Sequence, residues 1–262
     1  MALNSFVRHH ALVTGGGRGI GAAIAEALAR FGASISLIGR NVEVLEATAS
    51  RIAGDYGVKV ATAQADVGEE SAVRKAIANL RDTLGAPTIL VNNAGVAASS
   101  PFLSSDARFW RRLLETDLMG AVYVTQAVLP AMLESGWGRI INVASTAGLT
   151  GYAYITAYCA AKHGMIGLTR ALALETARSG VTVNALCPGY ADTEMTAQSI
   201  ANIAEKTGRS RQQAVASLVS RNPQGRFIQP VEVADAVVWL AGDQAGSVTG
   251  QSIVIAGGEL MP

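Results

Sequence analysis

The side chains best suited to acid–base chemistry lie in AYCAAKHG, residues 157–164, where Tyr158 and Lys162 are four positions apart. On a helix this spacing places both side chains on one face, so a phenol and an ammonium group would share one cleft. A tyrosine with its ordinary pKa near ~10 is a poor base at neutral pH, but a nearby positive charge favours the phenolate form. The pair therefore predicts a phenol that can both donate and accept a proton.

Seven short apolar runs alternate along the chain with longer segments rich in alanine and leucine. The runs are apolar on both faces, as expected for strands of a parallel sheet between two helix layers. The expected strands are residues 10–14, 34–38, 58–63, 88–92, 139–144, 181–186 and 252–256. Helical spacing of apolar residues predicts helices within 22–31, 42–53, 70–85, 106–134 and 156–178.

This alternation predicts an α/β fold, a Rossmann-type doubly wound, seven-stranded parallel sheet flanked by helices. A length of 262 residues allows one domain or two, but no linker, repeat or low-complexity tract divides the pattern. We therefore expect residues 1–262 to form a single domain. Only residues 191–229 break the rhythm, with a polar, helix-prone segment. Because ligands bind beyond the carboxyl ends of the strands in such sheets, we expect this segment to be a helical lid over the substrate.

The composition argues against several classes of protein. The net charge is +1 without a long basic block, so nucleic-acid binding is not expected. No run approaches the roughly 18 apolar residues of a membrane span, and no apolar signal core precedes the first strand. We expect a cytoplasmic protein without membrane contact. Half of the residues are hydrophobic and only 16% are charged, which suits a large core and a surface partly covered by other subunits.

Metal binding is not expected either. Cys159 and Cys187 lack the spacing of metal ligands, and the three histidines do not form a site. Lone cysteines commonly behave as small hydrophobic residues, so two buried free thiols are the preferred interpretation.

A glycine-rich turn, TGGGRGIG at residues 14–21, follows the first strand and opens directly into a helix. Such a turn lets the backbone approach a pyrophosphate, while the helix N-terminus offers unpaired N–H groups and a partial positive charge. Close packing of a helix on a strand would need the same glycines, so the glycines alone leave both interpretations open. The strand before the turn and the helix after it favour dinucleotide binding.

Together with later motifs, this turn is similar to that of the short-chain dehydrogenase/reductase family. The TGxxxGxG spacing, NNAG at residues 92–95, Ser145, Tyr158, Lys162, and the pair Pro188 and Gly189 follow the family's order over essentially the whole chain. The resemblance implies that the cofactor contacts Gly15, Gly17, Arg18, Gly19, Ile20, Gly21, Arg40, Asp66, Val67, Asn93, Ala94, Gly95, Tyr158, Lys162, Pro188, Gly189 and Thr193.

The resemblance also assigns catalytic roles. It implies that Tyr158 is the general acid in ketone reduction, that Lys162 supports it electrostatically and binds the ribose, and that Ser145 orients the substrate. Asp66 matches the position that hydrogen-bonds the adenine amino group, although a cap of the following helix would explain it nearly as well. Thr193 matches the residue that meets the carboxamide or phosphate end of the cofactor.

The end of the second strand, LIGRN, indicates which nicotinamide cofactor binds. Enzymes that use NAD tend to place an acidic residue there for the ribose 2′-hydroxyl, whereas a 2′-phosphate calls for arginine. Here the acidic position is Gly39, followed by Arg40, and Arg18 lies in the glycine turn on the same side. Two guanidinium groups can pair with a phosphate, and no carboxylate is expected to oppose them, although both could also be solvated surface residues. We predict NADP(H) in preference to NAD(H).

One position departs from the family pattern. The family commonly has an asparagine in a VNLxG-like stretch, where it holds a water molecule in the proton relay to the lysine. Here the stretch is TDLMG, with Asp117 in that place. Aspartate keeps the acceptor oxygens but adds a negative charge, so Asp117 is a candidate catalytic residue in a relay that could work differently.

The resemblance implies an NADP(H)-dependent oxidoreductase that reduces a ketone to a secondary alcohol, with a 3-oxoacyl thioester or related β-keto compound as the expected substrate. The lid segment is similar to those of polyketide ketoreductases and 3-hydroxybutyrate dehydrogenases. A 3-hydroxybutyrate-like dehydrogenase and a non-catalytic dinucleotide sensor are the alternatives, but a sensor would not need Ser145, Tyr158 and Lys162.

The expected partners follow from the same resemblance. Basic residues on or near the lid could meet a thioester carrier such as coenzyme A, although a solvated helix face explains them as well; they are Lys206, Arg209, Arg211 and Arg221. Arg178 matches a position used for carrier-protein docking, but its usual companion falls at Gly136. The long helices within 106–134 and 156–178 suit the family's usual homotetramer. Tyr152, Tyr154 and Tyr190 are expected to shape the substrate pocket.

Overall fold

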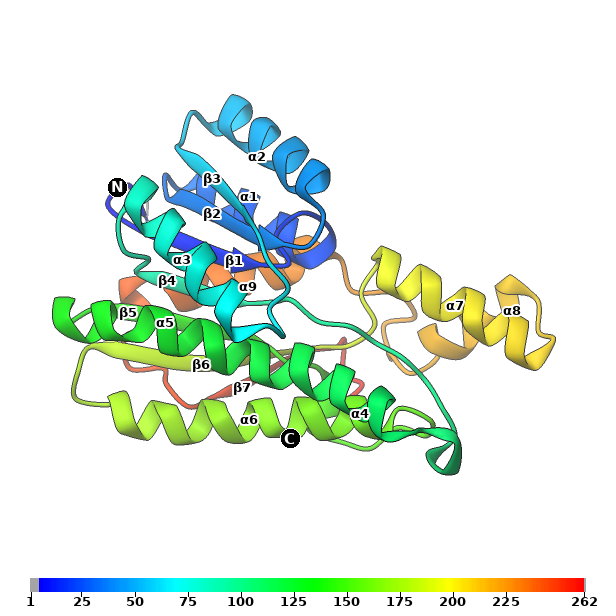
Figure 1. The fold of residues 1–262 in the computed structure, drawn as a ribbon. Coiled ribbons are helices and arrows are strands. Elements are labelled where there is room, and N and C mark those ends of the chain that lie inside the picture. The colour runs from blue at the N-terminus through cyan, green and yellow to red at the C-terminus, as the bar shows by residue number, and fades with distance from the viewer. Residues whose placement is uncertain (1–4, 262) are drawn as a thin grey trace.

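Seven parallel strands form one sheet in the computed structural model, which describes residues 5–261 (Figure 1). The strands are β1 (His10–Thr14), β2 (Ser34–Gly39), β3 (Val60–Gln64), β4 (Ile89–Asn92), β5 (Gly138–Val143), β6 (Val181–Pro188) and β7 (Ser252–Ile255). Their order across the sheet is β3-β2-β1-β4-β5-β6-β7. The predicted doubly wound fold is confirmed, and every predicted strand is found with boundaries that differ by at most two residues.

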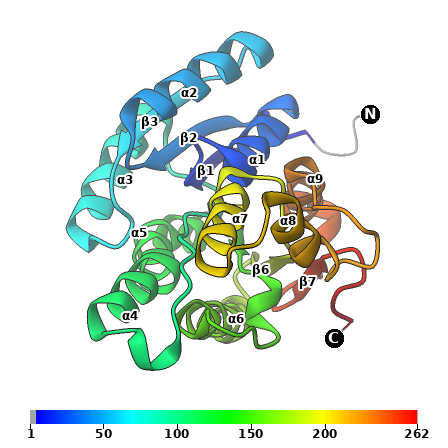
Figure 2. The same ribbon diagram turned by 90° about the vertical axis from the view of Figure 1, so that its right-hand side faces the viewer.

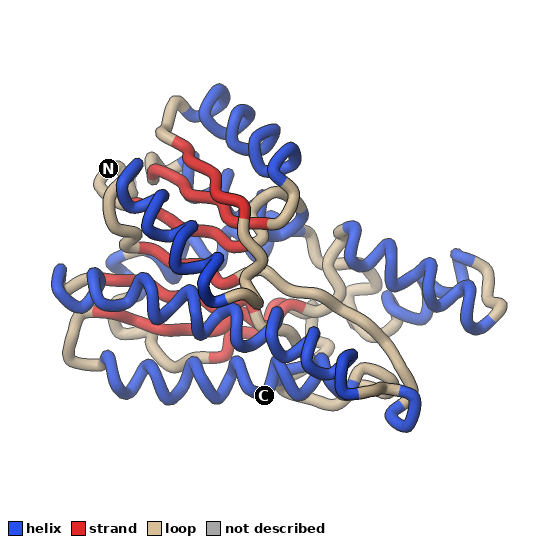
Figure 3. Tube along the Cα trace, in the orientation of Figure 1, coloured by secondary structure: helices blue, strands red, loops and turns tan. Residues whose placement is uncertain are grey.

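Helices cover both faces of this sheet, so the strands are sandwiched between two layers (Figures 1 and 3). One layer contains α1 (Gly19–Arg30), α2 (Val42–Tyr56) and α9 (Pro230–Ala241), and the other contains α3 (Glu70–Leu84), α5 (Gly120–Ser135) and α6 (Thr156–Thr176). In β1, Ala11 and Val13 pack on the α1 side, whereas Leu12 packs on the α3 side. Because successive side chains point to opposite faces and both faces are covered, the strands appear in the sequence as continuous apolar runs.

The predicted helical segment 106–134 is not one regular helix. It consists of α4 (Ala107–Leu114), a π-helical turn at Glu115–Met119, and α5. A π-helical turn holds an extra residue, which changes the side chains that face inward, and such turns are frequent at functional sites. In this turn Asp117 is fully buried.

Two helices, α7 (Glu194–Thr207) and α8 (Arg211–Val219), project beyond the carboxyl ends of the strands (Figures 1 and 2). They lie within the segment 191–229 that we expect to be a lid. Ile200, Ala214 and Leu218 form a small apolar cluster between them. Lys206 donates a hydrogen bond from Nζ to the carbonyl of Ser99 at 3.3 Å, which links α7 to the loop after β4. The position suits a lid, and its movement stays a prediction.

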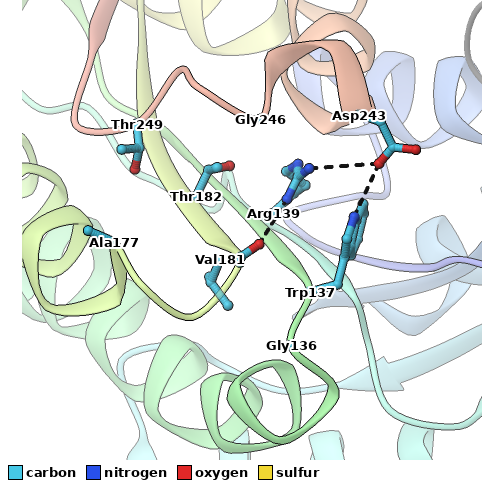
Figure 4. Close-up of a pocket in the computed structure, with 10 residues that line it drawn as sticks. Gly136, Trp137, Arg139, Ala177, Val181, Thr182, Asp243, Gly246 and Thr249 are labelled. Atoms are coloured by element: carbon cyan, nitrogen blue, oxygen red, sulfur yellow. Dashed lines mark hydrogen bonds and ion pairs between the residues drawn. The ribbon is translucent and has the colours of Figure 1, made fainter.

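A cavity of about 310 Å³ lies at the opposite end of the strands, beside the amino ends of β5 and β6 (Figure 4). Arg139 is 4% exposed there, and its Nη1 donates to the carbonyls of Gly138 at 2.8 Å and Gly180 at 3.2 Å. Its guanidinium also stacks on Trp137, 4.4 Å from a ring centroid, and lies 3.8 Å from Asp243. These contacts tie two strand starts to the turn after α9, so we assign Arg139 a structural role.

Gly180 offers a test of this tie, because its φ is +75° and a Cβ added there would lie 2.1 Å from the carbonyl oxygen of Gly136. Gly180→Ala is expected to lower the free energy of unfolding by about 2 kcal/mol or more. The added methyl group would collide with the carbonyl group of Gly136, and alanine rarely adopts the left-handed backbone of residue 180. Chemical denaturation measures the change. Gly167→Ala is the matched control in α6, where an added Cβ meets nothing within 4 Å, and it should be neutral or stabilise by about 0.5–1 kcal/mol. Equal stability changes in the two variants would contradict this account.

Candidate active site

The loops after β1 and β4 meet at the centre of the sheet, because the direction of the crossovers reverses between these two neighbouring strands. Thr14 ends β1, and its Oγ1 accepts hydrogen bonds from the backbone N–H groups of Asn93 and Ala94, both at 3.0 Å. The side chain of Asn93 donates back to the carbonyl of Thr14 at 2.9 Å. The glycine turn and the NNAG motif, about 80 residues apart in the chain, therefore form one unit.

The glycine turn fits a pyrophosphate. Gly15 and Gly19 have left-handed φ values of +63° and +56°, and a Cβ on Gly21 would lie 2.2 Å from the carbonyl oxygen of Gly15. The N-cap residue Arg18 makes no side-chain capping bond, and the first turn of α1 contains no acidic residue. The N–H groups of this turn, including that of Ile20, therefore remain available to an anion, in keeping with the predicted dinucleotide.

The two arginines predicted to hold a 2′-phosphate each face a carboxylate. Arg18 forms an ion pair with Glu194 at the start of α7, and Nη1 of Arg40 lies 3.9 Å from Oδ2 of Asp66. The expectation that no carboxylate opposes them is therefore wrong. Sequence spacing did not indicate these pairs, because the lid helix and the β3 loop reach the arginines only in the fold. Both arginine side chains are well exposed, at 68% and 65%, and exposed ion pairs of this kind contribute little energy.

Asp66 and Thr193 have local roles that the sequence only partly indicated. Oδ1 of Asp66 accepts from the backbone N–H of Gly68 at 3.0 Å, and α3 has Glu69 as its N-cap residue. The alternative interpretation of Asp66 as the helix cap is therefore wrong. Thr193 caps α7, and its Cγ2 lies 3.4 Å from the position of a Cβ on Gly19. The start of α7 thus lies against the glycine turn. Val67, which belongs to the loop after β3, is buried.

Ser145, Tyr158, Lys162 and Asp117 meet beside the carboxyl end of β5. Ser145 follows that strand, and its Oγ accepts from a backbone N–H in the short helix Thr146–Gly148. In α6, Nζ of Lys162 lies 5.6 Å from the centroid of the Tyr158 ring, on the same helix face as the four-residue spacing predicts. Lys162 is 3% exposed; its Nζ donates to the carbonyl of Val143 at 3.0 Å and lies 3.6 Å from Oδ1 of Asp117.

Burial raises the pKa of Tyr158 well above its ordinary value, and the charge of Asp117 raises it further, whereas a hydrogen bond with Ser145 lowers it. This net direction is opposite to the lowering that we expected from Lys162. The physical reason is that a phenolate loses its hydration in this position. The raised pKa therefore favours the neutral, protonated phenol of Tyr158.

Asp117 is a fully buried ionisable group of the site, held by Val96 and Lys162. Burial raises the pKa of its carboxyl group to about 6, while Lys162 and the backbone N–H of Val96 oppose this rise. Oδ1 accepts from Val96 at 3.1 Å, and Oδ2 has no hydrogen-bond partner among residues 5–261. A Cβ on Gly95 would lie 2.6 Å from Oδ1, so only glycine fits against this carboxylate. Because a buried charge is costly without a partner, Asp117 and Lys162 depend on each other.

The neighbourhood of β6 adds a residue that the sequence did not indicate. Pro188 ends β6, and a Cβ on the following Gly189 would lie 2.9 Å from Oε2 of Glu259. The same carboxylate receives a hydrogen bond from the hydroxyl of Tyr152 at 2.8 Å. The C-terminal tail carries no recognisable motif, so only the fold brings Glu259 to this site.

The remaining expectations concern thiols, metals and membranes. Both cysteines are free; Cys187 is buried, but Cys159, next to Tyr158, is only half-buried, so the expectation of two buried thiols is wrong for Cys159. Within residues 5–261, no group of three or more histidine, cysteine, aspartate or glutamate side chains could hold a metal ion. In the same part of the chain, no helix has both the length and the apolar character of a membrane span.

Comparison with known proteins places the chain in a family. Residues 9–204 match the family described as short chain dehydrogenase. The D-beta-hydroxybutyrate dehydrogenase of Rhizobium meliloti is 37% identical over 250 residues, which cover 95% of this chain and 97% of that protein. The 3-oxoacyl-acyl-carrier-protein reductase FabG of Aquifex aeolicus is 38% identical over 247 residues, which cover 94% of this chain and 95% of that protein.

Solved structures agree with this placement. A structure of an actinorhodin polyketide ketoreductase with NADPH is 37% identical, has a TM-score of 0.93, and covers 97% of this chain and 98% of its own. The chain therefore belongs to the short-chain dehydrogenase family. It is an oxidoreductase of the ketoreductase type, which acts on secondary alcohol or ketone groups with a nicotinamide dinucleotide.

Asp117 provides a pH test of the site. As the pH falls through about 6, the carboxyl group gains a proton and Lys162 loses its charged partner, so kcat/KM of the wild type should fall below that pH, by up to about tenfold. Asp117→Asn cannot take up this proton; it should lack the acidic limb and retain activity within about tenfold at pH 8. Steady-state rates between pH 5 and 9 measure both profiles. The same acidic limb in the variant would show that another group titrates.

Proposed function

We propose that this protein reduces a ketone to a secondary alcohol with NADPH, and that its substrate is a 3-oxoacyl thioester or a related β-keto compound. The observation that carries the proposal is the position of the Tyr158 phenol, which lies beside Ser145 and has the buried Nζ of Lys162 5.6 Å from its ring centroid at the carboxyl end of β5. The names of the relatives support β-keto chemistry, and the NADPH of the actinorhodin ketoreductase structure supports the cofactor.

In this proposal each residue has a distinct part in the reaction. The nicotinamide group, when bound, supplies the hydride. The hydroxyl group of Ser145 donates a hydrogen bond to the carbonyl oxygen of the substrate and stabilises its developing negative charge. Tyr158 gives its proton to that oxygen, and the positive charge of Lys162 then stabilises the phenolate that remains. Asp117 holds Lys162 in place beneath the phenol.

Two further features remain proposals. Exposed apolar side chains lie on α5, α6 and α9, and they support a homotetramer that would cover them: Leu133, Leu174, Val231 and Trp239. Carrier-protein docking has weaker support, because Arg178 has only Gly136 at the companion position. The lid role of residues 191–229 and the cytoplasmic location stay predictions.

A panel of β-keto compounds assayed with NADPH and with NADH tests this function through nicotinamide absorbance. Tyr158→Phe should lower kcat by about 100-fold or more, because it removes the proton donor, while binding of NADPH measured by fluorescence stays within a few-fold.

The related D-beta-hydroxybutyrate dehydrogenase supports an alternative, oxidation of a 3-hydroxy acid with NAD. A clear kinetic preference for NAD and 3-hydroxybutyrate would favour that alternative, and NADPH binding without turnover of any compound would favour a sensor.

Arg40 tests the predicted cofactor preference. Arg40→Ala should raise KM for NADPH by about tenfold and change KM for NADH much less, because only NADPH carries the 2′-phosphate that the guanidinium group would pair with. Arg74→Ala is the matched control, since Arg74 is a similarly exposed arginine that pairs with Glu70 on α3. If KM changes equally for the two cofactors, Arg40 does not contact the 2′-phosphate.

A further inference from the structure

Tyr152 lies in the loop between Ser145 and Tyr158, and its side chain contacts three other residues. Its hydroxyl group lies 2.9 Å from Oγ1 of Thr146 and 2.8 Å from Oε1 of Glu259. A carboxylate can only accept, so Tyr152 donates its single proton to Glu259 and accepts from Thr146. The guanidinium group of Arg221 lies over its ring, 4.7 Å from the centroid.

The two charged residues are fixed relative to each other by close backbone packing. After β7, Gly257 and Gly258 adopt φ values of +60° and +91°, and a Cβ on Gly257 would lie 2.0 Å from Oδ1 of Asn222. Asn222 is 8% exposed and follows Arg221 directly. The C-terminal tail that carries Glu259 is therefore packed against the segment after α8 that carries Arg221.

This cluster adjoins the candidate active site. A Cβ on Gly189, which follows the end of β6, would lie 2.9 Å from Oε2 of Glu259. Burial raises the pKa of Tyr190, on which the charges of Arg221, Glu259 and Tyr158 also act. Thr146, which hydrogen-bonds Tyr152, also follows Ser145 directly in the chain. A substrate carbonyl held by Ser145 and Tyr158 would have the cluster beside it.

The charges of the cluster are incompletely satisfied. Among residues 5–261, neither Arg221 nor Glu259 has an ion-pair partner. Glu259 is half-buried, and within residues 5–261 its carboxylate receives only the hydrogen bond from Tyr152. A carboxylate offers about four acceptor positions, so several remain for a ligand. An alkyl group placed against it would leave these acceptors without water or a donor, which costs binding energy.

The pair of opposite charges selects among polar ligands. A carboxylate on the substrate would pair with Arg221 but meet the like charge of Glu259, and an ammonium group would meet the converse conflict. A hydroxyl group can donate to the carboxylate and accept from the guanidinium at the same time. A hydroxyl group can therefore satisfy both residues, which a single carboxylate or a single ammonium group cannot.

We propose that Glu259, Tyr152 and Arg221 form a subsite for a substrate hydroxyl group, so that the enzyme prefers hydroxylated β-keto compounds to those with a plain alkyl chain. This inference rests on the proposed ketone reduction. It assigns Glu259 as the specificity-determining residue, because its carboxylate is the acceptor that an alkyl chain cannot satisfy.

Two pairs of ethyl esters of equal size test the subsite: 4-hydroxy-3-oxobutanoate with 3-oxopentanoate, and 5-hydroxy-3-oxopentanoate with 3-oxohexanoate. The wild type should show kcat/KM at least about tenfold higher for the hydroxylated member of one pair. Glu259→Leu should bring this ratio to about one or below, because the apolar side chain accepts the alkyl member instead. Glu259→Gln keeps the shape and one acceptor, and its ratio should lie between the two.

Glu205→Leu is the matched control, since it removes the same charge from an exposed position on α7; it should keep the ratio of the wild type. Binding of NADPH, followed by fluorescence, shows whether each variant is folded. A wild-type ratio near one in both pairs, or a ratio that both Glu259 variants leave unchanged, would overturn the subsite while the proposed reduction stands. Failure of the wild type to reduce any of the four esters would overturn the proposed function and the subsite with it.

Discussion

Lys162 and Asp117 carry opposite charges 3.6 Å apart, and neither side chain has more than slight contact with water. Removing either charge would leave the other buried alone, which is far more costly than burying both together. Three neighbouring features accommodate this buried pair. The π-helical turn directs Asp117 inward, Gly95 leaves space for its carboxylate, and the carbonyl of Val143 at the end of β5 receives a hydrogen bond from Lys162.

The pair also sets the state of the phenol above it. Desolvation already disfavours the phenolate of Tyr158, and the negative charge of Asp117 disfavours it further. An asparagine at this position would not contribute that charge. In this chain Asp117 therefore affects the acidity of the Tyr158 phenol as well as the position of Lys162.

The parallel sheet explains how such distant residues come together. All the strands are parallel, so the loops after β1, β4, β5 and β6 all lie at the carboxyl ends of the strands. The glycine turn, the NNAG motif, Ser145 and Gly189 are spread over most of the chain, yet all of them lie at these strand ends. Helices α7 and α8 and the segment after β7 lie beyond these strand ends, and they bring Glu194, Arg221 and Glu259 as new charges.

The sequence by itself determined the strands, most helices, and the candidate residues that stand in motifs, because apolar periodicity and glycine requirements act over short stretches of chain. It also placed Tyr158 and Lys162 on one helix face, since that relation is local to α6. It did not determine the π-helical turn, the carboxylates opposite Arg18 and Arg40, or the raised pKa of Tyr158. Those properties depend on burial and on charges brought from distant segments, and only the tertiary structure decides which side chains lose water and which partner they meet.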